Sequence, residues 1–218
     1  MIGKQDIIDR ILAAKLISII RLKEQAAVER TVHALIAGGI QVLEITTNTP
    51  GFAEEIEKAR ERHPNVLIGA GTITTGALAK QALASGAQFL VTPNTNKEVA
   101  VMGENAEICE TNGIPVLMGA MSPTEVADAL AYGADIIKLF PAGDLGISYF
   151  KSLKGPFDSV PFFAVGGVNE SNMRDWFDAG IEGVGLGSSL VKSSVRTDAD
   201  FKRISDLAKK FISLLEDL

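Results

Sequence analysis

The sequence predicts an α/β fold, a (β/α)8 TIM barrel with an N-terminal helix, in a single domain that spans residues 1–218. The first observation is a repeat, in which a helical pattern ends in a small residue and a glycine and an apolar run follows. The repeat glycines at 39, 86, 133 and 180 are each 47 residues apart. A fixed period of this size indicates a repeated architecture.

The second observation is that each period holds two apolar runs of strand length. Continuous apolar character is typical of strands that a parallel sheet buries on both faces. The eight predicted strands span residues 16–20, 42–46, 66–70, 89–92, 116–119, 136–140, 162–165 and 183–186. An open doubly wound sheet is the alternative, and the fourfold spacing favours the closed barrel.

Helical patterns lie between these runs. Residues 6–10 carry charges at helical spacing, which is unlike a secretory signal. A further helix is expected after Thr49-Pro50, and another begins at the capping box of Ser122 and Glu125, with proline at its first position. The final helix has an apolar stripe at a period of 3.6 residues over 201–215.

Composition excludes several function classes. The net charge is −6 and no Lys/Arg block occurs, so we expect no nucleic-acid partner. No apolar run is long enough to cross a bilayer, so no membrane association is expected. The single cysteine, Cys109, cannot form an internal disulfide, which favours a cytoplasmic protein. His33, His63 and one cysteine cannot form a zinc site of the usual kind, and we expect neither metal nor cofactor.

The repeat also relates positions on different strands. Five residues after the repeat glycines come Glu44, Val91, Lys138 and Gly185. Alternate strands of such a barrel contribute layers of four inward side chains, so these residues should share one layer. A charge that faced the helices would be buried without a role. We therefore expect Glu44 and Lys138 to face each other inside the barrel.

A lysine in this position suits covalent chemistry. Its sequence neighbours are apolar, and desolvation favours the neutral amine that attacks a carbonyl to form a Schiff base. A carboxylate across the site could move protons to and from substrate hydroxyls. The alternative is a purely structural Lys–Glu pair, and buried pairs often add little stability compared with apolar packing. We therefore predict catalytic roles for Lys138 and Glu44.

Polar and glycine residues follow the predicted strands at the end where barrels of this kind carry their sites. Arg21 could bind a carboxylate through two parallel hydrogen bonds. Glycine-rich turns after the last two strands favour a phosphate site made of backbone N–H groups. The residues at these strand ends are Arg21, Gly71-Thr72, Thr92-Pro93-Asn94, Gly166-Gly167 before Asn169, and Gly187-Ser188-Ser189.

Several segments together resemble the 2-keto-3-deoxy-6-phosphogluconate (KDPG) / 4-hydroxy-2-oxoglutarate (KHG) aldolase family, from about Ile7 to the C-terminus. The segments are Val42-Leu43-Glu44-Ile45-Thr46, Ile68-Gly69-Ala70-Gly71-Thr72, Gly119-Ala120-Met121-Ser122-Pro123-Thr124-Glu125, Ile137-Lys138-Leu139-Phe140-Pro141-Ala142 and Gly166-Gly167-Val168. The resemblance implies a class I, metal-free aldolase, usually a homotrimer. Such an enzyme cleaves KDPG, a phosphorylated 2-keto-3-deoxy sugar acid, to pyruvate and glyceraldehyde 3-phosphate. Some members also cleave KHG to pyruvate and glyoxylate.

The resemblance also implies residue roles. Lys138 would form the Schiff base, and Glu44 would be the general acid/base, partly through a water. The pyruvate end would be lined by Arg21, Thr72 and Pro93, and the phosphate would be bound by Gly166, Gly167 and Ser188; Gly187, beside Ser188, is included in the predicted substrate site.

Two positions depart from the phosphogluconate pattern. Asn48 stands where those enzymes typically carry a carboxylate-binding arginine, and Val165 stands where they carry a threonine. Both positions are included in the predicted substrate site. With the run Val91-Thr92-Pro93-Asn94, they resemble the 2-keto-3-deoxy-6-phosphogalactonate branch, which cleaves the C4 epimer. The remaining alternatives are a phosphate-binding barrel isomerase or epimerase, and a non-catalytic sugar-phosphate sensor.

Overall fold

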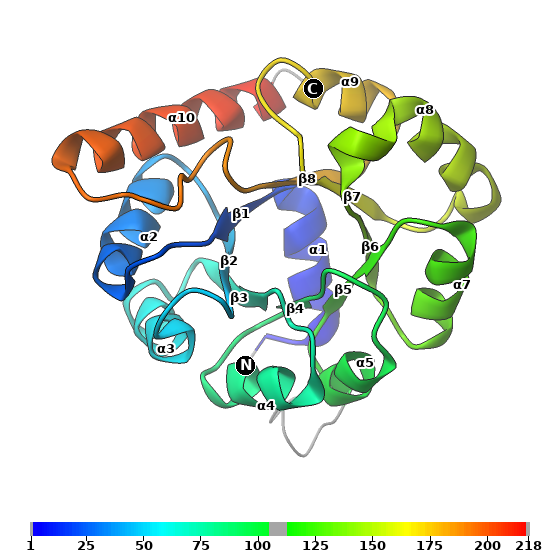
Figure 1. Ribbon diagram of the computed structural model, residues 1–218, viewed down its shortest axis with the longest axis horizontal. Coiled ribbons are helices and arrows are strands. Elements are labelled where there is room, and N and C mark those ends of the chain that lie inside the picture. The colour runs from blue at the N-terminus through cyan, green and yellow to red at the C-terminus, as the bar shows by residue number, and fades with distance from the viewer. Residues whose placement is uncertain (1, 105–112, 217–218) are drawn as a thin grey trace.

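The computed structural model describes residues 2–104 and 113–216, and its strands form a closed barrel (Figure 1). The strands are β1 (Leu16–Ile20), β2 (Val42–Thr46), β3 (Leu67–Gly71), β4 (Leu90–Val91), β5 (Val116–Ala120), β6 (Ile136–Leu139), β7 (Phe162–Val165) and β8 (Gly183–Leu186). They follow the chain order around the ring, and β8 pairs in parallel with β1. The predicted (β/α)8 TIM barrel is confirmed. Cys109 lies outside the described residues.

Helices surround the ring, except α1, which lies across one end of it (Figure 1). The helices are α1 (Lys4–Ala14), η1 (Gln25–Ala27), α2 (Val28–Ala37), α3 (Phe52–Arg62), α4 (Gly76–Ala84), α5 (Lys97–Glu104), α7 (Pro123–Ala131), α8 (Ala142–Lys154), η2 (Gly155–Phe157), α9 (Met173–Asp178) and α10 (Asp198–Glu216). Among them, α7 begins at the predicted capping box of Ser122 and Glu125. None of the helices within the described ranges has the length and hydropathy to traverse a bilayer.

The 47-residue repeat consists of helix stop signals. Its glycines, Gly39, Gly86, Gly133 and Gly180, have φ values of 96°, 82°, 96° and 95°. Each glycine lies two residues after the last residue of α2, α4, α7 or α9. A left-handed residue there ends the helix and redirects the chain into the next strand, and glycine adopts it without a Cβ penalty. The spacing therefore reflects the geometry of four helix-to-strand turns.

The barrel interior is closed at the end where the strands begin. Ile7 and Ile11 of α1 are 4% and 0% exposed, and they pack with side chains from inside the ring. Those side chains are Ile17, Val42, Leu67, Phe89, Val91, Leu117, Ile136 and Phe163. Figure 1 shows α1 lying across this ring. The opposite end, where the strands finish, is therefore the end at which a cavity can open.

The predicted strand ends differ from the structure mainly in β3 and β4. Strand β3 runs one residue further, to Gly71, and Val66 instead donates from its N–H to the His63 carbonyl. Strand β4 contains Leu90–Val91 alone. The Thr92 side chain replaces part of the ladder, because its hydroxyl accepts from the Gly119 N–H and donates to the Asn94 carbonyl.

Candidate active site

A cavity of about 480 Å³ opens at the C-terminal ends of the strands. Its lining includes every residue predicted for the site except Asn48. The predicted residues in its wall are Arg21, Glu44, Thr72, Pro93, Lys138, Val165, Gly166, Gly167, Gly187 and Ser188. Arg21 and Ser188, which are 167 residues apart in the sequence, thus meet in one chamber. This is the end at which barrels of this type place their chemistry.

The floor of this cavity contains the layer that the repeat predicts. Glu44, Val91, Lys138 and Gly185 together line a small space inside the barrel. Glu44 is 2% exposed and Lys138 is 5% exposed, so both ionisable groups are almost entirely removed from bulk water. Their strands lie on opposite sides of the ring. The two side chains therefore approach the same interior space from opposite walls.

Burial moves the protonation of both groups toward the neutral form. It raises the pKa of the Glu44 carboxyl, against the opposing attraction of Lys138 and Arg21. It also lowers the pKa of the Lys138 amine; the Glu44 charge acts in the opposite direction, and the Arg21 charge lowers the pKa further. In both cases desolvation is the largest cause. The amine is therefore more often in its nucleophilic form than an exposed lysine would be.

The glycine at the end of β3 makes room for the carboxylate. A Cβ on Gly71 would lie 2.3 Å from Oε1 of Glu44 and 2.5 Å from its Cδ. Any side chain there would displace the carboxylate from its position in the cavity wall. The absence of a side chain at this position is thus a condition for the placement of Glu44.

Arg21 and Thr72 form a second pair in the cavity wall. The Arg21 guanidinium donates to the Thr72 hydroxyl over 3.2 Å. Thr72 has a φ of 59°, in the left-handed region that β-branched residues rarely adopt. Such a conformation costs on the order of 1–3 kcal/mol and persists where the surroundings hold it. The pair offers a cation and a hydroxyl side by side, which is suited to a carboxylate.

The glycines after β7 form a close backbone turn. Gly166 and Gly167 have φ values of 86° and 79°, and a Cβ on Gly167 would lie 2.8 Å from the Cα of Gly143. Gly143 donates from its N–H to the Gly166 carbonyl over 2.7 Å. The Gly167 carbonyl accepts from the side-chain amides of Asn169 and Asn172. This turn is rigidly held and exposes backbone to the cavity, as an anion site requires.

Asn48 was predicted for the site but does not line this cavity, whereas Phe140 lines it without having been predicted. Asn48 is exposed and lies outside the cavity wall, because its Oδ1 accepts a hydrogen bond from the Thr46 hydroxyl over 2.7 Å. Phe140 lines the cavity, and its ring centroid lies 5.2 Å from the Lys138 Nζ. Its position two residues after Lys138, at the end of the predicted strand 136–140, was the signal that could have identified it.

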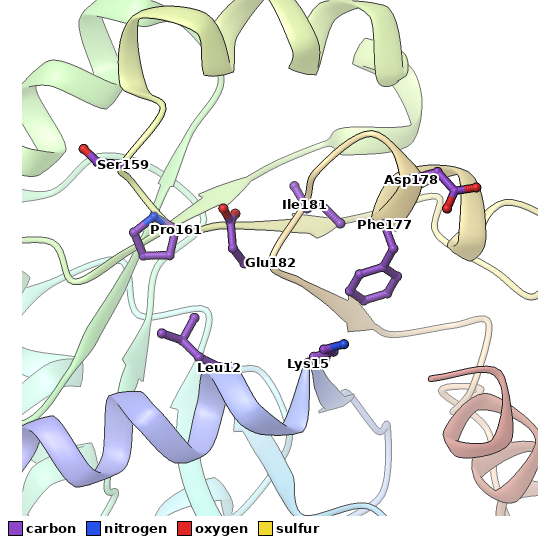
Figure 2. Close-up of a pocket in the computed structure, with 8 residues that line it drawn as sticks. All are labelled: Leu12, Lys15, Ser159, Pro161, Phe177, Asp178, Ile181 and Glu182. Carbon is purple, nitrogen blue, oxygen red and sulfur yellow. The ribbon is translucent and has the colours of Figure 1, made fainter. Parts of the chain in front are cut away.

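A second cavity, of about 580 Å³, lies at the opposite end of the barrel (Figure 2). Lys15, Phe177 and Glu182 are among its lining residues. The Glu182 carboxylate already accepts from Lys154 and from the Phe162 N–H, and Lys15 lies over the Phe177 ring. Lys15 and Glu182 in this cavity thus already have partners within the protein.

No group of His, Cys, Asp or Glu side chains in the described part of the chain is arranged to hold a metal ion.

Comparison with known proteins agrees with this arrangement of residues. The sequence model of the family described as KDPG and KHG aldolase matches residues 7–207. The chain belongs to this family. It is therefore an aldolase of class I, a carbon–carbon lyase. Of the features described above, the Glu44 and Lys138 strands and the glycine turn after β7 all fall within the matched residues.

Aldolases for both epimers are among its relatives. The chain is 31% identical over 216 residues to the 2-dehydro-3-deoxy-phosphogluconate aldolase of Treponema pallidum, covering 99% of each chain. It is 37% identical over 197 residues to a probable 2-dehydro-3-deoxy-6-phosphogalactonate aldolase of Rhizobium meliloti, covering 88% of this chain and 90% of that protein. A solved KDPG aldolase of Legionella pneumophila, with pyruvate captured as a covalent carbinolamine, is 31% identical with a TM-score of 0.80, over 93% and 96% of the two chains.

Proposed function

We propose that this member of the family cleaves a 2-keto-3-deoxy-6-phospho sugar acid to pyruvate and glyceraldehyde 3-phosphate, with Lys138 as the nucleophile. The observation that carries the proposal is that Lys138 and Glu44, both buried, line one chamber with Arg21. The amine attacks the C2 ketone, and the resulting carbinolamine loses water to give an iminium. This cation is the electron sink for the bond cleavage that follows.

Glu44 is the proton carrier in this mechanism. Its carboxylate accepts the proton of the C4 hydroxyl, directly or through a water, while the C3–C4 bond breaks and its electron pair forms an enamine. C4 leaves as the aldehyde carbon of glyceraldehyde 3-phosphate. The enamine takes a proton at C3, and water hydrolyses the imine to pyruvate and the free amine. Burial raises the pKa of Glu44, which suits a group that must both take and return a proton near neutrality.

The two ends of the substrate have different chemical partners. Arg21 and Thr72 bind the carboxylate beside C2, since they offer a paired cation and hydroxyl within reach of Lys138. Pro93 lines the same end, and the backbone at Gly166, Gly167 and Gly187, with the Ser188 hydroxyl, binds the phosphate. Val165 lies between these ends as an apolar wall.

The substrate proposed first is the gluconate epimer, KDPG, with KHG as a shorter second substrate. The galactonate epimer is the second candidate. Val165 supports it, because this residue presents no hydroxyl to the sugar chain in the cavity wall. The discriminating measurement is kcat/KM for the two phosphates, coupled to pyruvate detection. A ratio that favours the galactonate compound would reverse the order of these candidates.

Trapping tests the nucleophile. Borohydride reduction in the presence of pyruvate should add the mass of the reduced adduct to a peptide containing Lys138, and Lys138→Met should abolish the adduct. Lys15→Met, in the second cavity, is the matched control and should leave it unchanged. An adduct on another lysine would overturn the assignment. Full activity of Lys138→Arg would favour an isomerase or epimerase, and ligand binding without turnover would favour a sensor.

Two further expectations belong to the same proposal. The protein assembles as a homotrimer and works in the cytoplasm, as the family resemblance and the composition suggest. Sedimentation equilibrium at several concentrations measures the first expectation. A monomer at concentrations where the enzyme is fully active would contradict it.

A further inference from the structure

Three threonines lie at the end of β2 and just beyond it, with their hydroxyls next to backbone carbonyls at the end of β1 and just beyond β3. Thr46 and Thr49 are 0% and 1% exposed, and Thr47 is half-buried. Their hydrogen bonds lead to the two residues of the Arg21–Thr72 pair. We propose that the segment 46–49 is a positioning segment, which fixes Arg21 and Thr72 relative to each other for the substrate carboxylate. This inference rests on the proposed function.

The backbone on both sides of Arg21 is bound by this segment. The Ile20 carbonyl accepts from the Thr49 hydroxyl over 3.2 Å, and the Thr46 hydroxyl oxygen lies 3.1 Å from the same carbonyl oxygen. The Leu22 N–H donates to the Thr49 hydroxyl over 3.2 Å. Arg21 lies between these two contacts, just beyond the last residue of β1. The exposed guanidinium therefore extends from a backbone that is fixed by buried groups.

Thr72 is held by the next residue of the segment. The Thr47 hydroxyl donates to the Thr72 carbonyl over 2.8 Å, and the Thr47 N–H donates to the Gly71 carbonyl over 2.9 Å. These bonds lie on the two peptides that flank Thr72, at the point where its φ is 59°. They hold the left-handed conformation, and that conformation aims the Thr72 hydroxyl at Arg21. Thr47 thus acts through Thr72.

The test separates carboxylate binding from imine formation. In Thr47→Val, the pyruvate concentration that gives half-maximal trapping should rise about tenfold, as expected when a hydrogen-bonding partner of the carboxylate is misplaced. Trapping of acetone, which has the ketone and no carboxylate, should be unchanged. Thr47→Ser should restore the wild-type value, and Thr47→Val should add little in a Thr72→Gly background. The loss with substrate should appear mainly in KM.

Thr31→Val is the matched control. The Thr31 hydroxyl is buried on α2 and donates to the Ala27 carbonyl over the same 2.8 Å, away from the cavity. Thr31→Val should lower the melting temperature about as much as Thr47→Val does, without changing the trapping of pyruvate or of acetone. Equal losses for pyruvate and acetone in Thr47→Val, or no loss for either, would overturn the positioning role. Absence of any adduct in the wild-type protein would instead overturn the proposed function, and the positioning role with it.

Discussion

Glu44 and Lys138 occupy one layer of the barrel interior on strands β2 and β6, from which they approach the same cavity. Each lowers the cost of charging the other, while burial opposes the charge on both. Burial is the larger effect on both, so the pKa of Glu44 is raised and the pKa of Lys138 is lowered. Opposite shifts of two facing ionisable groups are typical of sites that transfer protons.

Replacement of the carboxylate should separate imine formation from cleavage. In Glu44→Gln we expect pyruvate to be trapped on Lys138 while kcat for cleavage falls by about 10²–10⁴-fold, the usual contribution of a positioned acid/base. Steady-state turnover and borohydride trapping measure the two quantities on one preparation. Equal loss of both would show that Glu44 is needed to form the imine as well.

The same variant should change the pKa of the lysine. Glu44 raises the pKa of Lys138, so its removal leaves desolvation and Arg21, which both lower that pKa. The amine should become neutral at a lower pH than in the wild type. The rate of Lys138 modification by a small electrophile, followed against pH without substrate, reports this shift. Glu54→Gln, on an exposed part of α3, should leave the profile in place. A shift to higher pH would contradict the electrostatic account.

Gly71→Ala tests the space that the carboxylate needs. The added Cβ would lie 2.3 Å from Oε1 of Glu44, so the carboxylate must move. We expect kcat to fall by about 10–100-fold, since small misplacements of a reacting group have large effects on rate. Gly155→Ala, whose Cβ would meet nothing within 4 Å, is the matched control and should keep wild-type kinetics. Unchanged activity in Gly71→Ala would remove the steric argument.

Gly167→Ala should act on phosphorylated substrates in particular. Its φ is 79° and its Cβ would approach the Cα of Gly143 at 2.8 Å, so the turn must rearrange. We expect kcat/KM for the phosphorylated acid to fall by about tenfold or more, and that for KHG, which has no phosphate, to change much less. Comparable losses on both substrates would place the effect at the reacting centre.

Ser18 offers a test of stability away from the site. Its buried hydroxyl has no hydrogen-bond partner among the residues that the structure describes. An unpaired buried hydroxyl is unfavourable, so Ser18→Ala should leave the free energy of unfolding unchanged or raise it by up to about 1 kcal/mol. Thr31→Ala, which loses a paired hydroxyl, should lower it by about 1 kcal/mol. Urea unfolding measures both, and a greater loss in Ser18→Ala would contradict the prediction.

Features of the structure that follow from the repeat could be predicted from the sequence. Features that depend on contacts between residues far apart in the chain could not. The glycine period predicts the barrel and the shared layer of Glu44 and Lys138, because equal steps along the chain reach equal positions on alternate strands. The left-handed Thr72 and its bond from Thr47 depend on residues 25 positions apart, which no local pattern encodes. Asn48, predicted for the substrate site, is exposed beside the Thr46 hydroxyl two residues earlier, and its role in binding stays a prediction.

The helix α1 also determines how molecules enter and leave the barrel. Ile7 and Ile11 close the end where the strands begin, so substrate and products share one entrance. Under the proposed mechanism pyruvate stays covalently attached at the bottom while the aldehyde lies nearer the entrance. The aldehyde must therefore depart first, and in the synthetic direction pyruvate must arrive first. We expect an obligatory order of release, in which pyruvate is the product that competes directly with the sugar acid.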